Sequence, residues 1–390
     1  MDRQQRKEIL LQLFQAGVDA VGGVQATTRA LSKERFDAPV HLVAVGKAAD
    51  AMTQGALDVL GDRLVTGLVI TKHHHLSDDV RADARLECIE SGHPVPDEQS
   101  LHAGARLYDF VGNLAEEDQL IFLVSGGASA LVEHLDNNLT LADLKATTDK
   151  LLASGAPIGE MNRHRRQISL IKGGKLGKVL KCKVLQLLIS DVPGDVLGDI
   201  GSGLLVPDAA TDMPENLPVW RRVSTKIIAS SAIAQKAVAD AAQEQGFDLQ
   251  QATGNLDGDV DAVSERVART LTTAPHGIYI WGGEPTVVLP DKPGRGGRNQ
   301  HLALSLAATA AVHGTLSVLV CGTDGTDGPT VDAGGLVDEA STGFAEQQAI
   351  DIAQHLQCAD AGTALANLDL LVTTGPTGTN VMDLCIAFAE

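Results

Sequence analysis

Short apolar runs separated by helix-like segments recur along the first half of the chain and set its fold class. The runs are HLVAV at 41–45, GLVIT at 67–71, LIFLV at 120–124 and KVLQLLIS at 183–190. Runs that are apolar at every position predict strands buried on both faces, as in a parallel sheet covered by helices. The sequence therefore predicts a parallel α/β fold for this half.

A proline-containing stretch at 201–222 ends this pattern, and a second series of apolar runs follows it. Three prolines lie in the stretch among Gly, Asp, Thr and Asn, a composition typical of loops. The later runs are KIIAS at 226–230, GIYIW at 277–281, SVLVC at 317–321 and LDLLVT at 368–373. Because 390 residues exceed the usual size of one domain, we expect two α/β domains, residues 1–222 and residues 223–390.

The charge balance excludes two classes of partner. A formal net charge of −19 repels nucleic acid and anionic membranes. Aromatic residues make up 3% of the chain, which leaves no stacking platform for single-stranded nucleic acid. We expect small-molecule substrates, with no nucleic-acid or membrane partner, and any bound anion then needs a local positive site.

Cysteine usage and the first residues predict a cytoplasmic protein. The five cysteines are odd in number and show no C-x-x-C spacing, which favours free thiols in a reducing compartment. Residues 1–21 are charged at the start and then amphipathic, which predicts a helix rather than a signal peptide. The most apolar stretch, near 120–132, is too short to span a bilayer.

Polar turns follow three of the predicted strands of the first half, at the position where parallel sheets bind ligands. Lys47 opens a helix and opposes its dipole, so it is either a solvated side chain or the ligand of an anion. Ser125-Gly126-Gly127-Ala128-Ser129 follows LIFLV and forms either a phosphate cradle or a plain tight turn. Asp191 follows KVLQLLIS, where a carboxylate suits magnesium or a substrate hydroxyl, or else caps a turn.

The second half repeats this composition at its own predicted strand ends. Gly282-Gly283-Glu284-Pro285-Thr286 follows GIYIW, and a basic, glycine-rich loop with Arg295 and Arg298 precedes the next apolar run. SVLVC leads into the glycine loop 322–328, whose two aspartates do not have the spacing of a calcium loop. The last run leads into the polar turn 373–380.

These loops bring together the residue types that phosphoryl transfer needs. Lysine, arginine, hydroxyls and carboxylates around glycine turns can position two substrates and neutralise phosphate charge. The chain has no G-x-x-x-x-G-K-[ST], no H-R-D loop and no complete G-x-G-x-x-G, which excludes Walker-type NTPases and protein kinases and disfavours dinucleotide dehydrogenases. The triplet at 73–75 is a weak metal candidate because consecutive residues at a strand end point in alternate directions.

Eight short blocks, spread over nearly the whole chain, carry a family resemblance. They are Val45-Gly46-Lys47-Ala48, Gly92-His93-Pro94-Val95-Pro96-Asp97, Ser125-Gly126-Gly127-Ala128-Ser129, Ile171-Lys172-Gly173-Gly174-Lys175-Leu176, Ser190-Asp191-Val192-Pro193-Gly194-Asp195, Gly282-Gly283-Glu284-Pro285-Thr286, Gly296-Gly297-Arg298-Asn299-Gln300 and Thr374-Gly375-Pro376-Thr377-Gly378-Thr379-Asn380. Each is modest alone, but the ordered set is specific. In this order they resemble the class II glycerate 2-kinases, whose C-terminal half is called the MOFRL domain.

The resemblance implies an enzyme that uses ATP and magnesium (Mg2+) to phosphorylate the 2-hydroxyl of D-glycerate. It also implies an N-terminal Rossmann-like α/β/α domain, a C-terminal mixed α/β domain of the MOFRL type, and an active site in the interdomain cleft. The family's reactive lysine and arginine match Lys47 and Arg298 here. The resemblance therefore suggests that these two residues face each other across the cleft.

The other candidate residues have less definite roles. Asp191 is the candidate to orient or deprotonate the glycerate hydroxyl, and Glu284 and Asp324 are candidates for magnesium or ribose contacts. Magnesium therefore has three candidate acids. The candidates for substrate or nucleotide binding are Ser125, Gly126, Gly127, Ser129, Glu284, Asn299, Asp324 and Thr377.

Three functions stay open at this point. The first is glycerate 2-kinase, or a kinase for a related small 2-hydroxy acid. The second is hydroxypyruvate reductase, which the incomplete glycine fingerprint disfavours because a reductase needs a nicotinamide site. The third is a catalytically silent metabolite-binding protein. For the oligomeric state, the sequence leaves a monomer and a homodimer as alternatives.

Overall fold

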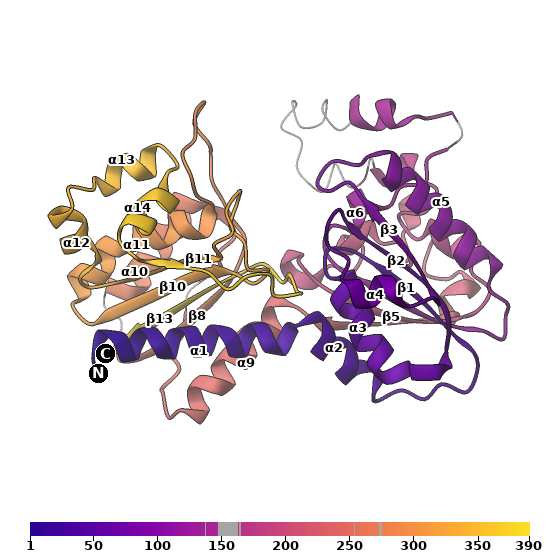
Figure 1. Ribbon diagram of the computed structural model, residues 1–390, viewed down its shortest axis with the longest axis horizontal. Coiled ribbons are helices and arrows are strands. Elements are labelled where there is room, and N and C mark those ends of the chain that lie inside the picture. The colour runs from indigo at the N-terminus through magenta and orange to yellow at the C-terminus, as the bar shows by residue number, and fades with distance from the viewer. Residues whose placement is uncertain (137, 147–162, 164, 253, 273–274) are drawn as a thin grey trace. The chain divides into compact units, whose positions relative to one another are not determined.

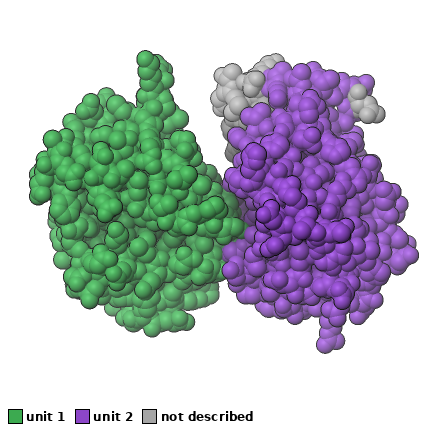
Figure 2. Space-filling view, in the orientation of Figure 1, with its two compact units in different colours: residues 1–21, 230–390 green, residues 22–229 purple. Residues whose placement is uncertain are grey.

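The computed structural model describes residues 1–136, 138–146, 163, 165–252, 254–272 and 275–390. The chain divides into two compact units, which Figure 2 shows in separate colours. One unit, here called the parallel-sheet unit, comprises Gly22–Ala229. The other, the antiparallel-sheet unit, combines Met1–Val21 with Ser230–Glu390.

The parallel-sheet unit is built on six parallel strands in the order β3-β2-β1-β4-β5-β6. The chain starts inside the sheet at β1, runs to one edge at β3, and returns to β4 on the other side of β1, which is the doubly wound order. This confirms the Rossmann-like prediction. The strands are β1 Val40–Val45, β2 Leu64–Lys72, β3 Leu86–Ser91, β4 Gln119–Val124, β5 Lys183–Ile189 and β6 Val223–Ala229.

Helices cover both faces of this sheet (Figure 1). Helix α5 packs Leu107 and Val111 on Phe122 and its neighbours in the core of one face, and Asp97 caps the helix by accepting the backbone N–H of Ser100 at 3.0 Å. Helices α2 and α3 pack against each other and against the sheet. The helices of this unit are α2 Gly23–Leu31, α3 Ala49–Leu60, α4 Asp78–Ala82, α5 Glu98–Asn113 and α6 Ala128–Leu131, with short 3-10 turns at Gly61–Arg63, Lys175–Lys178, Pro193–Asp195, Ile200–Ser202, Ala209–Thr211 and Pro218–Arg222.

The antiparallel-sheet unit contains a five-stranded sheet in the order β12-β11-β10-β13-β8, with every neighbouring pair antiparallel. A separate parallel pair joins two short strands, β7 and β9. The final strand, β13, lies inside the sheet between β8 and β10, although its sequence was not among the predicted runs. The strands are β7 Gly258–Asp259, β8 Gly277–Gly283, β9 Pro285–Thr286, β10 Leu316–Gly322, β11 Gly334–Asp338, β12 Leu371–Val372 and β13 Asp383–Ala389.

Two sets of helices bury the faces of the antiparallel sheet. Helices α1 and α9 pack together and cover one face of β13, while α10, α11 and α14 share a buried core with the other. Every residue of β10 and β13 is buried. The helices are α1 Arg3–Val21, α9 Ser231–Glu244, α10 Val260–Thr272, α11 Arg298–His313, α12 Ser341–Gln347, α13 Ile352–Gln357 and α14 Ala361–Asn367.

Two segments belong to a different unit from the one expected. The run KIIAS was placed in the second series, but it ends β6 of the parallel sheet, where Leu188 pairs with Ile227. Helix α1 starts the chain but packs in the antiparallel-sheet unit, since Leu13 and Phe14 are buried and the Arg6 Nε donates to the Ser317 Oγ at 3.0 Å. The units therefore divide after Val21 and after Ala229, whereas the sequence suggested a single boundary at 222.

Candidate active site

The loops after β1 and β4 are joined directly at the point where the strand order reverses. The Lys47 N–H donates to the Gly126 carbonyl at 2.9 Å, and the Ala48 N–H donates to the Ser125 Oγ at 3.0 Å. Gly46 has φ of +135°, and a Cβ there would lie 2.1 Å from the Ser125 Oγ. Only glycine therefore permits this close approach of the two loops.

Lys47 and Asp191 lie against neighbouring glycines of the same turn. A Cβ on Gly126 would lie 1.8 Å from Oδ2 of Asp191, and a Cβ on Gly127 would lie 3.0 Å from Cγ of Lys47. The strands β1, β4 and β5 are in register at these ends, because Val45 pairs with Val124 and Val124 pairs with Leu188. The structure thus brings a cation, a glycine turn and a carboxylate to one edge of the sheet, as the sequence predicted.

His93 joins this cluster, although sequence reasoning gave it no role. A Cβ on Gly127 would lie 3.0 Å from the Cδ2 of His93. Burial, with the nearby positive charges of Lys47 and Lys72, lowers the pKa of His93 to about 4. The imidazole is therefore neutral near pH 7 and can donate or accept a hydrogen bond. Its only signal in the sequence was the Gly92 to Asp97 block of the family resemblance.

Ser129 takes part in the packing beneath this turn. Its Oγ lies 2.7 Å from the Oγ of Ser202, and its carbonyl accepts from the Lys172 Nζ at 2.8 Å. Lys172 also pairs with Glu133, and the two side chains are 1% and 0% exposed. Breaking such a fully buried pair costs several kcal/mol. This pair therefore anchors α6, and Ser129 braces the turn.

Arg298 is the first residue of α11 and is held by two carboxylates. Its Nε donates to Oδ2 of Asp383 at 2.6 Å, and its Nη1 lies 2.6 Å from Oε1 of Glu284. Burial raises the pKa of Asp383 to about 6, and the Arg298 charge opposes this rise. Burial likewise disfavours the charged guanidinium, but Asp383 and Glu284 outweigh it and raise the pKa of Arg298. The guanidinium is thus fixed in one orientation.

Asp327, the second aspartate of the 322–328 loop, caps α11. Its carboxylate accepts the backbone N–H groups of Asn299 at 3.1 Å and Gln300 at 2.8 Å. A Cβ on Gly297 would lie 2.3 Å from Oδ1 of Asp327, so the glycine makes room for the cap. Burial raises the pKa of Asp327 to about 7, although the two backbone bonds lower it. The N-terminus of this helix therefore already holds a carboxylate.

The other predicted residues of the antiparallel-sheet unit mainly support loops and packing. Asn299 is fully buried. Asp324 accepts the Thr326 N–H at 3.0 Å in its own turn. Thr377 donates to the Thr323 carbonyl at 2.6 Å, which ties the turn after β12 to the turn after β10.

Arg295 and Arg298, the two arginines of the basic loop, have different roles. Arg295 pairs with the buried Asp332 and donates to the Gly362 carbonyl at 3.0 Å. It thereby ties the loop to α14. Arg298 is the arginine of this loop that lies beside the acidic cluster of Glu284, Asp327 and Asp383.

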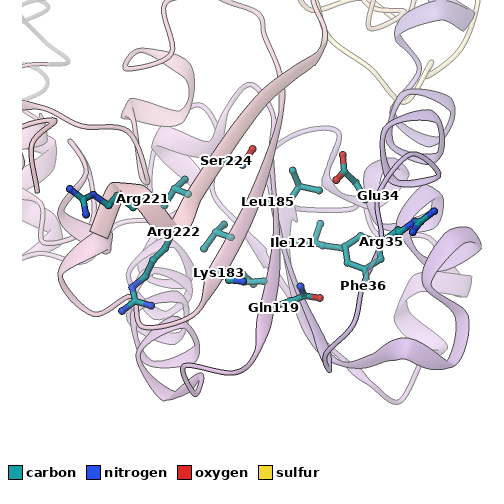
Figure 3. A pocket seen from close by; sticks show the side chains of 13 residues that line it. Glu34, Arg35, Phe36, Gln119, Ile121, Lys183, Leu185, Arg221, Arg222 and Ser224 are labelled. Carbon is teal, nitrogen blue, oxygen red and sulfur yellow. The ribbon is translucent and has the colours of Figure 1, made fainter. Parts of the chain in front are cut away.

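A hollow of about 400 Å³ in the parallel-sheet unit lies away from the Lys47 turn (Figure 3). Gln119, Lys183 and Val223, the first residues of β4, β5 and β6, line it together with Phe36. Lys47 follows the carboxyl end of β1, whereas this hollow lies at the amino ends of the parallel strands. It is therefore separate from the candidate active site.

The described residues were compared with the requirements of a metal site and of a membrane-spanning helix. They contain no group of three or more His, Cys, Asp or Glu side chains placed to hold a metal ion. Within the same residues, the helices are all too short or too polar to cross a membrane.

Comparison with known proteins identifies the family. Residues 9–236 match a domain of unknown function (DUF4147), and residues 277–383 match the MOFRL family. The chain is 36% identical to the D-glycerate 2-kinase of Thermotoga maritima, with 99% of each chain covered. The chain belongs to the glycerate kinase family. A glycerate 2-kinase of Pyrococcus horikoshii is also 36% identical, covering 89% of this chain and 87% of its own.

Solved structures agree with this membership. A crystal structure of glycerate kinase from Thermotoga maritima matches with a TM-score of 0.90 and 33% identity, covering 99% of this chain and 100% of that one. One relative, from Agrobacterium vitis, carries the name hydroxypyruvate reductase and is 34% identical over 97% of this chain and 93% of its own. The family resemblance stated from the sequence is therefore confirmed.

Proposed function

We propose that this glycerate kinase family member transfers the γ-phosphoryl group of ATP to the 2-hydroxyl of D-glycerate, giving 2-phospho-D-glycerate and ADP. The observation that carries the proposal is the placement of Lys47 and Asp191 against adjacent glycines of one turn, at the edge where doubly wound sheets bind ligands. The names of the glycerate 2-kinase relatives support the same reaction.

In this proposal Asp191 orients the glycerate 2-hydroxyl and accepts its proton as the phosphoryl group is transferred. Lys47 offsets negative charge on the transferring phosphoryl, which is the main contribution a protein makes to this reaction. The neutral His93 beside Lys47 can hold a glycerate oxygen by a hydrogen bond without adding charge. All three residues lie at the Gly126-Gly127 turn or at its border.

Arg298 is proposed to bind an anionic group of the substrates. Its two carboxylate partners differ in exposure, because the side chain of Asp383 is 2% exposed and that of Glu284 is 42% exposed. Asp383 is therefore the permanent partner that orients the guanidinium. Glu284 is the partner that an incoming carboxylate or phosphate replaces, since its contact with Nη1 is open to solvent.

Magnesium is proposed to enter with the nucleotide. Mg2+ commonly binds substrate phosphates and only one or two protein carboxylates, so a site needs no cluster of three acids. Asp191 and Asp324 offer such oxygens, and Glu284 does so once a substrate anion replaces it at Arg298. When bound, the ion neutralises charge on the phosphates.

The same proposal places the enzyme in the cytoplasm, acting on small molecules as a monomer or homodimer. All five cysteines are free thiols, which supports a reducing compartment. A related small 2-hydroxy acid is the alternative acceptor. Hydroxypyruvate reductase is the alternative reaction, supported only by the name of the Agrobacterium vitis relatives.

Thermal unfolding with added ligands tests the class of reaction. A ligand that binds the native state raises Tm, so we expect ATP with Mg2+ to raise it and NADPH to leave it unchanged. ADP release that depends on D-glycerate completes the test. Protection by NADPH but not by ATP would favour the reductase, and protection by D-glycerate alone would favour a binding protein.

A further inference from the structure

A second hollow, of about 390 Å³, lies in the antiparallel-sheet unit beside Arg298. Its walls are mainly apolar, and Arg298 and His301 border it from neighbouring positions on the first turn of α11. No Asp or Glu is among the described residues that line it, although the chain as a whole carries a net charge of −19. The apolar side chains of its walls are Pro285, Val287, Leu289, Pro293, Pro329, Ala359 and Ala361.

The size and chemistry of this hollow, here called the α11 pocket, fit one of the two proposed substrates. Its volume of about 390 Å³ lies within the usual range for small-molecule sites. D-glycerate is a three-carbon acid with polar atoms on every carbon, so it gains little from walls of proline and aliphatic side chains. A planar heterocycle gains from such walls, because its faces are apolar and its edge is polar.

We propose that the α11 pocket binds the base and ribose of the nucleoside triphosphate, with the phosphates toward Arg298. This inference rests on the proposed kinase function and adds to it the place of the nucleotide. The arginine supplies the positive charge that the phosphates need at one end of the pocket. The lining has no acidic side chain, so the base and ribose meet no carboxylate there, and the phosphates take the place of Glu284 at Arg298.

His301 adds an imidazole to the lining of the α11 pocket. The residue is 6% exposed, and burial lowers the pKa of its imidazole, although Asp261 opposes this. The ring is therefore neutral near pH 7. Its Nδ1 has no hydrogen-bond partner among the described residues, and its Nε2 lies 3.6 Å from the exposed Asp261. The imidazole thus retains hydrogen-bonding capacity.

The loops at the reversal point of the parallel-sheet unit are tied to each other by their own backbone donors. The backbone N–H groups of Lys47 and Ala48, which open α3, donate to Gly126 and Ser125. The proposal therefore gives the Lys47 turn, with Asp191 beside it, to the smaller acceptor and Arg298 to the nucleotide.

Two neighbouring exposed residues provide a matched test. Leu289 lines the α11 pocket and is 63% exposed, whereas Val288 is 83% exposed and does not line it. Leu289→Asp adds a carboxylate beside the nucleotide, so we expect KM for ATP to rise about tenfold or more. Val288→Asp adds the same charge next to the pocket, and we expect KM for ATP to change less than about twofold. KM for D-glycerate stays unchanged in both variants.

Photolabelling with 2-azido-ATP locates the base directly in the full-length protein. We expect ATP-protected label on peptides that carry residues 285–301 or 359–361. Label confined to residues 22–229, or equal KM values for ATP in the two variants and wild type, overturns the pocket assignment while the kinase function stands. A wild-type protein that neither binds ATP nor consumes it with D-glycerate overturns both the function and the pocket.

Discussion

The two units position their charged clusters in different ways. In the parallel-sheet unit, strand order and three glycines bring Lys47 and Asp191 to one turn, and backbone hydrogen bonds hold the loops together. In the antiparallel-sheet unit, Arg298 is held by ion pairs with Asp383 and Glu284. The first cluster depends on backbone geometry, and the second depends on buried charge. Substitutions should therefore damage them differently.

Removing either cation should give the largest effect. Lys47→Ala and Arg298→Ala each delete positive charge from the proposed transition state, so we expect kcat to fall by about 10³-fold or more while the fold is retained. Lys183→Ala is the control. Lys183 lies at the amino end of β5, away from the Lys47 turn, so this variant should keep wild-type kcat. Steady-state kinetics and circular dichroism check this. Near-normal turnover in either folded variant would remove that residue from the mechanism.

A methyl group in the Lys47 turn should give the next largest effect. The Cβ of Gly126→Ala would lie 1.8 Å from Oδ2 of Asp191, so the carboxylate has to move. A displacement of this size costs about 10²-fold in kcat, which steady-state kinetics would measure.

Gly112→Ala is the matched control for that substitution. Its Cβ meets Val179 at an ordinary 3.5 Å, and the residue lies within α5. We expect unchanged kcat and up to about 1 kcal/mol of added stability from the higher helix propensity of alanine. Equal turnover in the two alanine variants would show that the turn does not position Asp191.

The two partners of Arg298 should separate stability from binding. Asp383→Asn leaves the guanidinium of Arg298, which is 34% exposed, without its main partner, so we expect the free energy of unfolding to fall by about 2 kcal/mol in denaturant titrations at pH 8. Glu284→Gln removes a partner that is 42% exposed, which should cost at most about 1 kcal/mol. If Glu284 competes with a substrate anion for Arg298, Glu284→Gln also lowers KM for the substrate that carries this anion. A Glu284 variant with a higher KM would contradict the exchange of partners.

The acidic cap of α11 should produce a smaller, pH-dependent effect. Burial raises the pKa of Asp327 from 3.8 to about 7, so the folded state binds a proton that the unfolded state releases. Stability contributed by this group is therefore lost as pH rises from about 4 to 7, with a slope of up to about 1.4 kcal/mol per pH unit. We expect Asp327→Asn to lose this part of the pH dependence in denaturant titrations. An unchanged pH profile would contradict the raised pKa.

The sequence predicted the parallel-sheet unit better than the other, for a physical reason. Its strands are continuous apolar runs, and a parallel sheet aligns their carboxyl ends, so Lys47, the glycine turn and Asp191 could be grouped without knowing any contact. The antiparallel cluster depends on residues far apart in sequence, since Arg298 and Asp383 are 85 positions apart. Asp383 had no local signal that set it apart, and the apolar run of β13 at 384–389 was not among the predicted strands.

Helix α1 and His93 show the same limit. The amphipathic pattern predicted a helix at residues 1–21 but not the unit in which its apolar face would be buried. His93 lies beside Lys47 because the segment after β3 reaches the Gly127 turn. Such long-range packing leaves no trace in local composition.

The regiochemistry of the product is the decisive property of the proposed reaction. Purified protein is incubated with ATP, Mg2+ and D-glycerate, and pyruvate is followed with enolase and pyruvate kinase but without phosphoglycerate mutase. We expect pyruvate under these conditions, because enolase acts on the 2-phosphate. Pyruvate that forms only after mutase is added would mean that the 3-hydroxyl is the acceptor, and would contradict transfer to the 2-hydroxyl.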